Sequence, residues 1–145
     1  MIQMPAQMLH ATCVDFQSKG VLITGRSGKG KSALALQLMA YGAVLVSDDQ
    51  TEVSAKDGKV CARAPRPTHG MIEVRGIGLL NAQALTSSTV ELVVDLDQLE
   101  TERLPHLHGT DVCGLTLPCL YYFDAPHFPA GILQYLKAGR REPHD

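Results

Sequence analysis

Eight consecutive residues in the first quarter of the chain have the spacing of a phosphate-binding loop. The segment 25–32 reads GRSGKGKS and matches G-x-x-x-x-G-K-[ST] at every defined position. In such a loop, glycines let successive backbone N–H groups point at one anion, and the helix that follows adds the positive end of its dipole. We expect Lys31 to reach the β- and γ-phosphates and the Ser32 hydroxyl to hold Mg²⁺. The candidate phosphate-binding residues are Gly25, Arg26, Ser27, Gly28, Lys29, Gly30, Lys31 and Ser32.

Two adjacent carboxylates, Asp48 and Asp49, follow the apolar segment 43–46. Ligands of open parallel sheets bind at the carboxyl ends of the strands, so we expect this pair to face the phosphate-binding loop. Adjacent side chains diverge in extended backbone. One carboxylate could therefore accept the proton of an attacking hydroxyl while the other supports Mg²⁺. The alternative is a solvated Asp-Asp turn.

A second carboxylate and a guanidinium lie two residues apart in the segment 71–75, which we expect to be extended. Alternating positions of a strand share a face, so Glu73 and Arg75 would point the same way. A carboxylate for a metal ion and a guanidinium for phosphate oxygens would form a second wall of the site. A surface Glu-x-Arg pair is the commoner meaning of this spacing.

The pattern of apolar and turn-forming residues predicts the elements that position these groups. We expect strands over 9–16 and 21–24, a helix over 33–41 that ends at Gly42, and a buried strand over 43–46. Residues 21–47 would then form one βαβ unit. The remaining expected elements are a hairpin over 51–63 around Asp57-Gly58, a loop over 64–70, strands over 71–75, 90–95 and 115–123, a helix over 130–138 and a frayed end from 140 to 145.

Length and charge exclude several classes of protein. A chain of 145 residues suits one domain, which we place at 1–138 with a tail at 139–145. The 13 basic and 15 acidic residues give a net charge of −2, which argues against a nucleic-acid-binding protein. No apolar run approaches the length of a membrane span, and no Lys or Arg precedes Lys19 as in a signal peptide. We therefore expect a cytoplasmic protein without a membrane partner.

The cysteines favour reduced thiols. Cys13, Cys61, Cys113 and Cys119 are scattered, with no C-x-x-C pair, and a chain of this length does not need disulfides. The pair His106 and His108 near Cys113 lacks further ligands at the spacing of a zinc site. We expect neither disulfides nor zinc.

Four segments together resemble the catalytic domain of HPr kinase/phosphorylase. They are Leu9-His10, the loop 25–32, the sequence LVSDD at 45–49 and the sequence EVRGIGLLN at 73–81, and they occur in the family's order over residues 9–136. The resemblance implies an α/β P-loop fold with a mixed sheet and a P-loop helix, shared with phosphoenolpyruvate carboxykinase-like kinases. It also implies a bifunctional enzyme that phosphorylates a serine of the phosphocarrier protein HPr with ATP or pyrophosphate and Mg²⁺. The same enzyme would remove that phosphate with inorganic phosphate.

The resemblance also implies individual roles. Lys31 and Ser32 would hold phosphates and metal, and Asp48 would take the serine proton and return it in the reverse reaction. Asp49 and Glu73 would serve Mg²⁺ and Arg75 would contact phosphate. His10 would lie against Asp48 and tune its ionisation. Arg103 resembles part of a later motif tied to the phosphorylase direction.

The chain resembles a short form of the family that carries the catalytic domain alone. We therefore expect no counterpart of the N-terminal domain of the long-form enzymes, and a shorter C-terminal part than the family's tail, whose helices grip HPr and build a hexamer. HPr is therefore the expected partner, and a homo-oligomer is possible by analogy with the long form.

Two other functions fit the phosphate-binding loop. One is a kinase of the same fold that acts on a small hydroxylated metabolite, and the other is a non-enzymatic nucleotide sensor. The carboxylate pair favours a kinase, because a sensor needs no proton acceptor at the point of attack.

Overall fold

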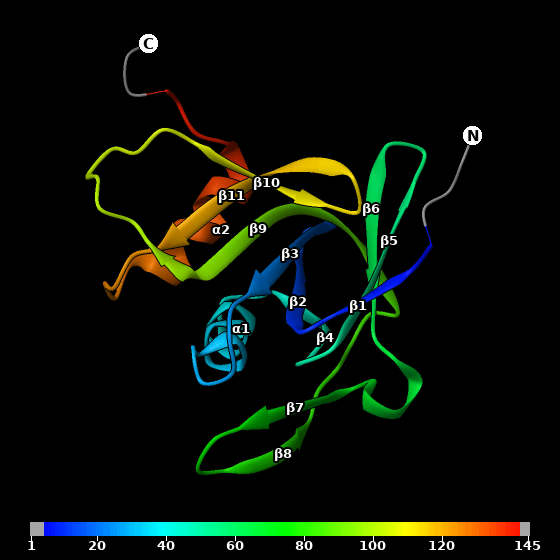
Figure 1. The fold of residues 1–145 in the computed structure, drawn as a ribbon. Coiled ribbons are helices and arrows are strands. Elements are labelled where there is room, and N and C mark those ends of the chain that lie inside the picture. The colour runs from blue at the N-terminus through cyan, green and yellow to red at the C-terminus, as the bar shows by residue number, and fades with distance from the viewer. Residues whose placement is uncertain (1–4, 143–145) are drawn as a thin grey trace.

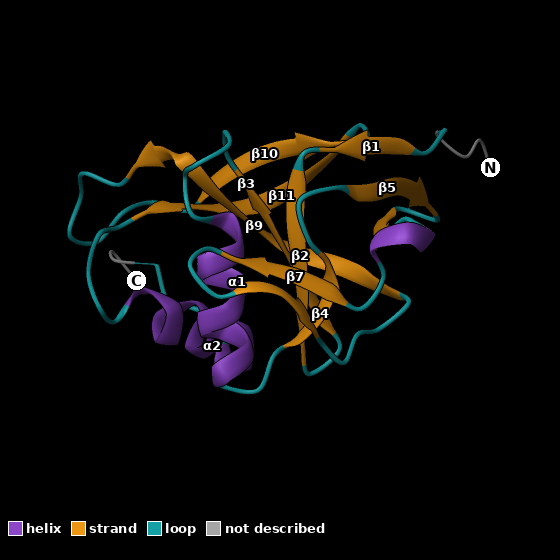
Figure 2. Cartoon of the chain, turned by 90° about the horizontal axis from the view of Figure 1, so that it is seen from below, coloured by secondary structure: helices purple, strands orange, loops and turns teal. Residues whose placement is uncertain are grey.

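The structure, a computed structural model, describes residues 5–142 and consists of a mixed sheet with two helices on one side (Figures 1 and 2). A separate two-stranded sheet, β7–β8, lies beside helix α1. The elements are β1 (Gln7–Leu9), β2 (Ala11–Phe16), β3 (Lys19–Thr24), α1 (Lys31–Ala40), β4 (Val44–Ser47), β5 (Thr51–Lys56), β6 (Lys59–Arg63), a 3-10 helix (Arg66–Thr68), β7 (Met71–Val74), β8 (Gly78–Asn81), β9 (Ser87–Leu99), β10 (His108–Val112), β11 (Leu115–Tyr122) and α2 (Phe128–Ala138).

Strands β3, β9 and β11 are neighbours and run parallel. Strand β2 pairs antiparallel with both β3 and β4, so β4 runs in the same direction as β3. The carboxyl ends of β3, β4, β9 and β11 therefore lie at one edge of the sheet. This is the edge at which open α/β sheets bind their ligands.

The expected βαβ unit is present, but its two strands are not neighbours. Strand β2 lies between β3 and β4, because a two-residue turn folds β2 back onto β3. Gln17 and Ser18 of this turn have positive φ angles of 52° and 69°, as a type I′ hairpin requires. Strand β4, expected over 43–46, therefore has an antiparallel neighbour within the βαβ unit, and the α/β class with a mixed sheet is confirmed.

The strand expected over 9–16 is two strands that meet at His10. Strand β1 pairs with β5, whereas β2 pairs with β3 and β4. The hairpin at Asp57-Gly58 is confirmed. Strand β9 is longer than the expected 90–95, because its first residues pair with β6 and its last with β11.

Both faces of the central strands are buried. On β3, Val21 and Ile23 belong to the core under the two helices, whereas Leu22 belongs to the core on the opposite face, which β5, β6, β10 and β11 share. This is the alternation expected of successive strand residues. Figure 2 shows α1 and α2 together on one side of the sheet.

The chain after α2 is held to the molecule at Arg140, where the sequence predicted fraying. The Arg140 guanidinium Nη2 donates to the carbonyl of Pro105 at 2.6 Å. Residues 143–145 of the expected tail lie outside the described residues.

Close packing between β3 and β9 predicts a large effect at Gly20. A Cβ at this position would lie 2.7 Å from the backbone oxygen of Thr89. We expect Gly20→Ala to lower the free energy of unfolding by about 1–3 kcal/mol, as overpacking does. Denaturant unfolding followed by circular dichroism measures the change.

Gly131→Ala is the matched control, because a Cβ there meets nothing and the residue lies within helix α2. We expect it to stabilise the protein by about 0.4–1 kcal/mol. Equal stability of the two variants would contradict the packing argument.

Candidate active site

The phosphate-binding loop connects β3 to α1, as the sequence predicts. Gly28 and Gly30 have φ angles of 83° and 95°, and a Cβ at either residue would meet nothing. The backbone conformation therefore explains why both positions are glycine, because the left-handed region is costly for other residues. Gly30 is the residue before helix α1, and its carbonyl accepts the first helical hydrogen bond from Leu34 at 2.9 Å.

Lys31 is folded into the interior of this loop. Its Nζ donates to the carbonyl oxygens of Gly25 at 2.7 Å and Arg26 at 3.2 Å, and only 6% of the residue is exposed. The ammonium group therefore lies at the N-terminus of α1, where its charge and the helix dipole both favour an anion.

The Asp48 carboxylate lies beside the loop and accepts hydrogen bonds from three different elements. Its Oδ1 accepts hydrogen bonds from Ser32 Oγ at 2.6 Å and Thr12 Oγ1 at 3.1 Å, and its Oδ2 accepts one from the backbone N–H of Glu73 at 2.9 Å. The residue is 7% exposed. The structure thus brings Asp48 to the loop as expected, and the solvated-turn alternative does not apply to it.

Asp49 points away from Asp48 and contacts His10. Its φ of 68° is left-handed, and its backbone N–H donates to Thr12 Oγ1 at 3.1 Å. Asp49 Oδ1 lies 3.3 Å from His10 Nδ1, and His10 Nε2 lies 3.1 Å from Ser27 Oγ. The two carboxylates therefore have different partners, although Asp49 is not in the extended backbone on which the prediction rested, and His10 joins Asp49 to the phosphate-binding loop.

The expectation that His10 lies against Asp48 was wrong. Thr12 covers the Asp48 carboxylate from β2, while the break between β1 and β2 places the His10 ring at the more exposed Asp49. The expected pairing of Ser32 with Asp49 at a metal also differs from the structure, in which Ser32 contacts Asp48.

Glu73 and Arg75 do not share one strand face. Strand β7 ends at Val74, and Arg75 opens the turn to β8, which a hydrogen bond from Ile77 N to Val74 O closes at 3.0 Å. The alternation argument for Arg75 was therefore wrong. Glu73 reaches the site through its backbone N–H, and its side chain is exposed.

Asp97 contacts the phosphate-binding loop at Arg26, and the sequence analysis did not identify this residue. Its carboxylate accepts the backbone N–H of Arg26, at 3.2 Å to Oδ1 and 3.1 Å to Oδ2, and also Arg26 Nε at 3.3 Å. Arg26 was expected among the phosphate-binding residues, but in the structure its side chain contacts this carboxylate. The rule that led to Asp48 also applies to Asp97, because it lies near the carboxyl end of β9, which is parallel to β3.

Arg103 lies in a different pocket from the phosphate-binding loop. It lines a cavity of about 170 Å³ beyond the ends of β9 and β11, and no residue of 25–32 lines that cavity. The structure therefore does not bring Arg103 into contact with Asp48 or Lys31.

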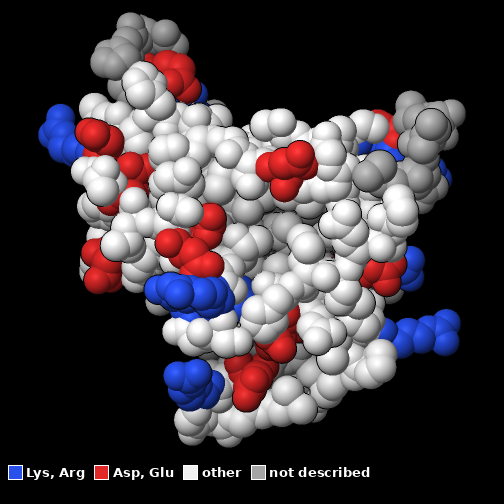
Figure 3. All heavy atoms as spheres, viewed as in Figure 1, with Lys and Arg blue, Asp and Glu red and all other residues white. Residues whose placement is uncertain are grey.

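The thiols, metal-ligating side chains, helices and surface charges of the described residues can also be compared with the expectations from the sequence. Cys13, Cys61, Cys113 and Cys119 are free thiols, and burial raises the pKa of Cys119 to about 11. Within residues 5–142, no group of three or more His, Cys, Asp or Glu side chains is arranged to hold a metal ion. Neither described helix is long and apolar enough to span a membrane. Figure 3 shows acidic and basic side chains interspersed on the face seen in Figure 1.

The contact of Asp97 with the loop predicts a pH-dependent stability. The backbone N–H of Arg26 has the largest effect and lowers the pKa of Asp97, burial opposes it, and the Arg26 guanidinium and Lys29 lower the pKa further. A carboxyl group whose pKa is lower in the folded state stabilises the fold at any pH above its unfolded-state pKa, which is near 4. This stabilisation is lost as the pH falls through the folded-state pKa. We expect Asp97→Asn to unfold more easily than wild type at pH 7, with the gap closing as the pH falls below about 4.

Urea unfolding between pH 2.5 and 7 measures this gap, with Glu91→Gln, which removes an exposed carboxyl on β9, as the control. A gap independent of pH would contradict the proposed contact.

Comparisons with known proteins agree with this geometry. Residues 3–112 match the HPr Serine kinase C-terminal domain. The chain is 44% identical over 81 residues to an HPr kinase/phosphorylase of Clostridium beijerinckii, an alignment that covers 56% of this chain and 27% of the relative. It is 36% identical over 114 residues to one of Clostridium acetobutylicum, covering 74% and 38%.

Among solved structures, the Hpr(Ser) kinase/phosphatase of Coxiella burnetii superposes with a TM-score of 0.76. That match covers 90% of this chain and 94% of the other at 24% identity, and it establishes the shared fold. The chain spans between 27% and 38% of the two clostridial relatives. The match over residues 3–112 shows that the chain belongs to the HPr serine kinase C-terminal domain family.

Proposed function

We propose that this chain transfers a phosphoryl group from ATP, with Mg²⁺, to a serine hydroxyl of HPr. The observation that carries the proposal is the 2.6 Å hydrogen bond from Ser32 to Asp48, which joins the phosphate-binding loop to a buried carboxylate. The family supports the choice of acceptor, because the matched relatives are named HPr kinase/phosphorylase. HPr is thus the proposed partner, and a homo-oligomer stays a prediction.

The loop would bind the phosphates of the nucleotide. Phosphate oxygens would accept from the backbone N–H groups of residues 28–32, and Lys31 would turn its ammonium group from the carbonyls of Gly25 and Arg26 toward them. Binding to these groups would hold the terminal phosphate beside Ser32 and Asp48. Such positioning of the reacting groups provides much of the catalysis of phosphoryl transfer.

The oxygen donors beside the loop fit Mg²⁺. Ser32 Oγ uses its hydrogen in the bond to Asp48, which leaves its lone pairs free, and the Asp48 carboxylate lies within 2.6 Å of it. Mg²⁺ commonly takes one or two carboxylates plus substrate phosphates. Ser32 would hold the ion, with Asp49 and Glu73 as the remaining candidate ligands, which leaves Asp48 for the proton. The ion would supply charge neutralisation at the phosphate oxygens.

Asp48 Oδ2 is the proposed proton acceptor. Oδ1 already accepts two hydrogen bonds and Oδ2 accepts one, so one of the four lone-pair positions of the carboxylate is left, and it is on Oδ2. As the serine oxygen forms its bond to the γ-phosphorus and the bond to ADP breaks, the hydroxyl proton would pass to this atom.

The reverse reaction would use the same atom. When an oxygen of inorganic phosphate attacks phosphoserine, pyrophosphate forms and the seryl oxygen takes the proton back from Asp48. Pyrophosphate would be the alternative donor in the forward direction. Arg103 stays a candidate for this phosphorolysis.

The residues around this centre have supporting roles in the proposal. His10, held by Asp49, would fix the position of Ser27 in the loop. Arg75 lies at the tip of the β7–β8 hairpin, whose backbone already contacts Asp48 at Glu73. From there its guanidinium would contact phosphate from the side opposite the loop.

Replacing the proposed acceptor tests the function. We expect Asp48→Asn to reduce transfer of label from ATP to the serine of HPr by about 100- to 10,000-fold, the usual contribution of a positioned acid or base. Nucleotide binding should change far less, because the loop and Lys31 remain. Radiolabel transfer and isothermal titration calorimetry measure the two quantities.

Glu91→Gln is the matched control and should transfer label as wild type does. Transfer by Asp48→Asn at the wild-type rate would contradict the proposed chemistry, whereas nucleotide binding by wild type without any transfer would favour a nucleotide sensor. Turnover of a small hydroxylated metabolite by wild type, with none on HPr, would contradict the proposed acceptor.

A further inference from the structure

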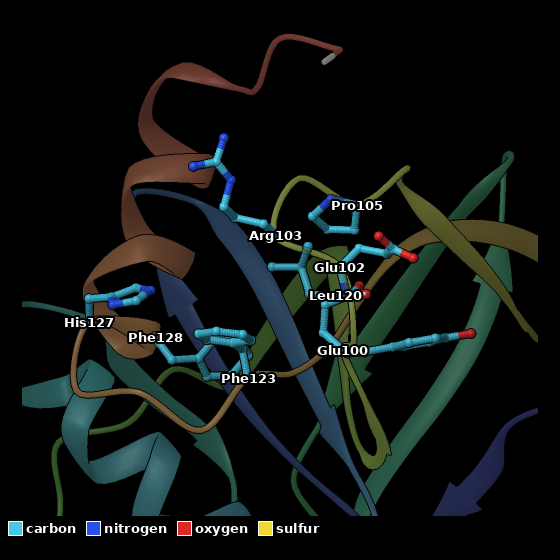
Figure 4. Close-up of a pocket in the computed structure, with 9 residues that line it drawn as sticks. Glu100, Glu102, Arg103, Pro105, Leu120, Phe123, His127 and Phe128 are labelled. Atoms are coloured by element: carbon cyan, nitrogen blue, oxygen red, sulfur yellow. Dashed lines mark hydrogen bonds between the residues drawn. The ribbon is translucent and has the colours of Figure 1, made fainter. Parts of the chain in front are cut away.

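A second pocket lies at the same edge of the sheet as the phosphate-binding loop. It has a volume of about 170 Å³, and its walls include Glu100, Leu120, Phe123 and Phe128 (Figure 4). The chemistry proposed above makes no use of these four residues. Their place in the fold and the shape of the pocket indicate what it could bind.

The pocket lies on the opposite flank of the loop from Asp48. Asp95 of β9 pairs with Thr24, the last residue of β3, on one side and with Tyr121 of β11 on the other. Two residues later Asp97 contacts the loop at Arg26, and Glu100 then lines the pocket. Strands β2 and β4, which carry the carboxylate site, lie on the other side of β3.

The walls of the pocket are suited to a flat ring. Figure 4 shows Phe123, His127 and Phe128 grouped on one side, with Leu120 and Pro105 across from them. Phe123 leaves 40% of its surface exposed, and its ring centre lies 5.8 Å from that of His127. Phe128 is held edge-on by Tyr122, with ring centres 5.6 Å apart and planes at 88°. Aromatic faces of this kind bind nucleobases by stacking, with little dependence on sequence.

The loop that closes the pocket is held in place before any ligand binds. Glu100 Oε1 lies 2.7 Å from His108 Nε2, and Oε2 accepts the backbone N–H groups of Thr101 and Glu102 at 3.0 and 3.1 Å. The His108 ring stacks on Tyr121 at 3.7 Å. A preformed pocket avoids the cost of ordering its walls when the ligand arrives.

We propose that this pocket binds the base of the nucleotide whose phosphates occupy the loop. The inference rests on the proposed function, because the γ-phosphate must face Asp48 for transfer to serine. The α-phosphate and the nucleoside then extend from the loop toward β9 and β11, where the pocket lies. The serine-bearing substrate must bring its hydroxyl to Asp48, on the other flank of the loop. The protein therefore prefers a nucleoside triphosphate over an inorganic polyphosphate as ligand and donor.

The test compares ATP with inorganic tripolyphosphate, which has the same three phosphates and no nucleoside. Calorimetry with Mg²⁺ measures the affinity of each ligand for wild type and for Phe123→Ala. We expect wild type to bind ATP about tenfold or more tightly than tripolyphosphate, from the usual contribution of base stacking. Phe123→Ala should lose most of this preference while its affinity for tripolyphosphate stays unchanged.

Two further variants complete the test. Tyr41→Ala removes another exposed aromatic, 62% exposed at the far end of α1, and should bind both ligands as wild type does. Phe123→Leu keeps an apolar side chain and removes only the stacking face, so it should also weaken ATP alone. It keeps the test informative if Phe123→Ala does not fold.

Equal affinity of wild type for ATP and tripolyphosphate would overturn the inference. So would an unchanged ATP preference in both Phe123 variants, or a raised KM for HPr with unchanged ATP affinity. If, in these cases, wild type binds tripolyphosphate and Lys31→Ala does not, the proposed function is still supported. Failure of wild type to bind either ligand would overturn both proposals.

Discussion

The hydrogen bonds to the buried Asp48 carboxylate hold the candidate site together. They come from Thr12 on β2, Ser32 on α1 and the backbone of Glu73 on β7, three elements from different parts of the chain. A buried carboxylate needs such partners, because an unsatisfied one costs far more than a neutral polar group. The phosphate-binding loop, the β2 strand and the β7–β8 hairpin are therefore fixed relative to one another by the group to which we assign the proton transfer.

A single topological fact explains why the functional residues converge. Strands β3, β4, β9 and β11 all point to the same edge, so the groups that follow them lie there together. The loop follows β3, Asp48 follows β4, and the pocket lined by Phe123 follows β11. This arrangement divides the edge into the flank to which we assign phosphoryl transfer and the flank at which we place the nucleoside.

The features that the sequence predicted correctly depend on local rules. The loop 25–32, the helix after it and the hairpin at Asp57-Gly58 each follow from residues within a few positions of one another. Asp48 was located by the strand-edge rule, which needs only one strand direction. At Arg75, where the strand ends, the alternation pattern gave the wrong neighbour, and at His10, where β1 meets β2, the family resemblance did.

The features that were missed depend on contacts between distant residues. The insertion of β2 between β3 and β4, the covering of Asp48 by Thr12 and the contact of Asp97 with Arg26 each join segments that are not adjacent in sequence. The order of strands in a sheet arises from the packing of the whole sheet, and the local sequence pattern does not reveal it. The parallel pairing of β3 with β9 is another such contact, because it joins Gly20 to Val90. Closing so long a loop precedes any gain from the pairing, so folding that depends on it is slow compared with helix or hairpin formation. During synthesis, the segment that carries GRSGKGKS must therefore wait for β9, at residues 87–99, before its conformation is fixed.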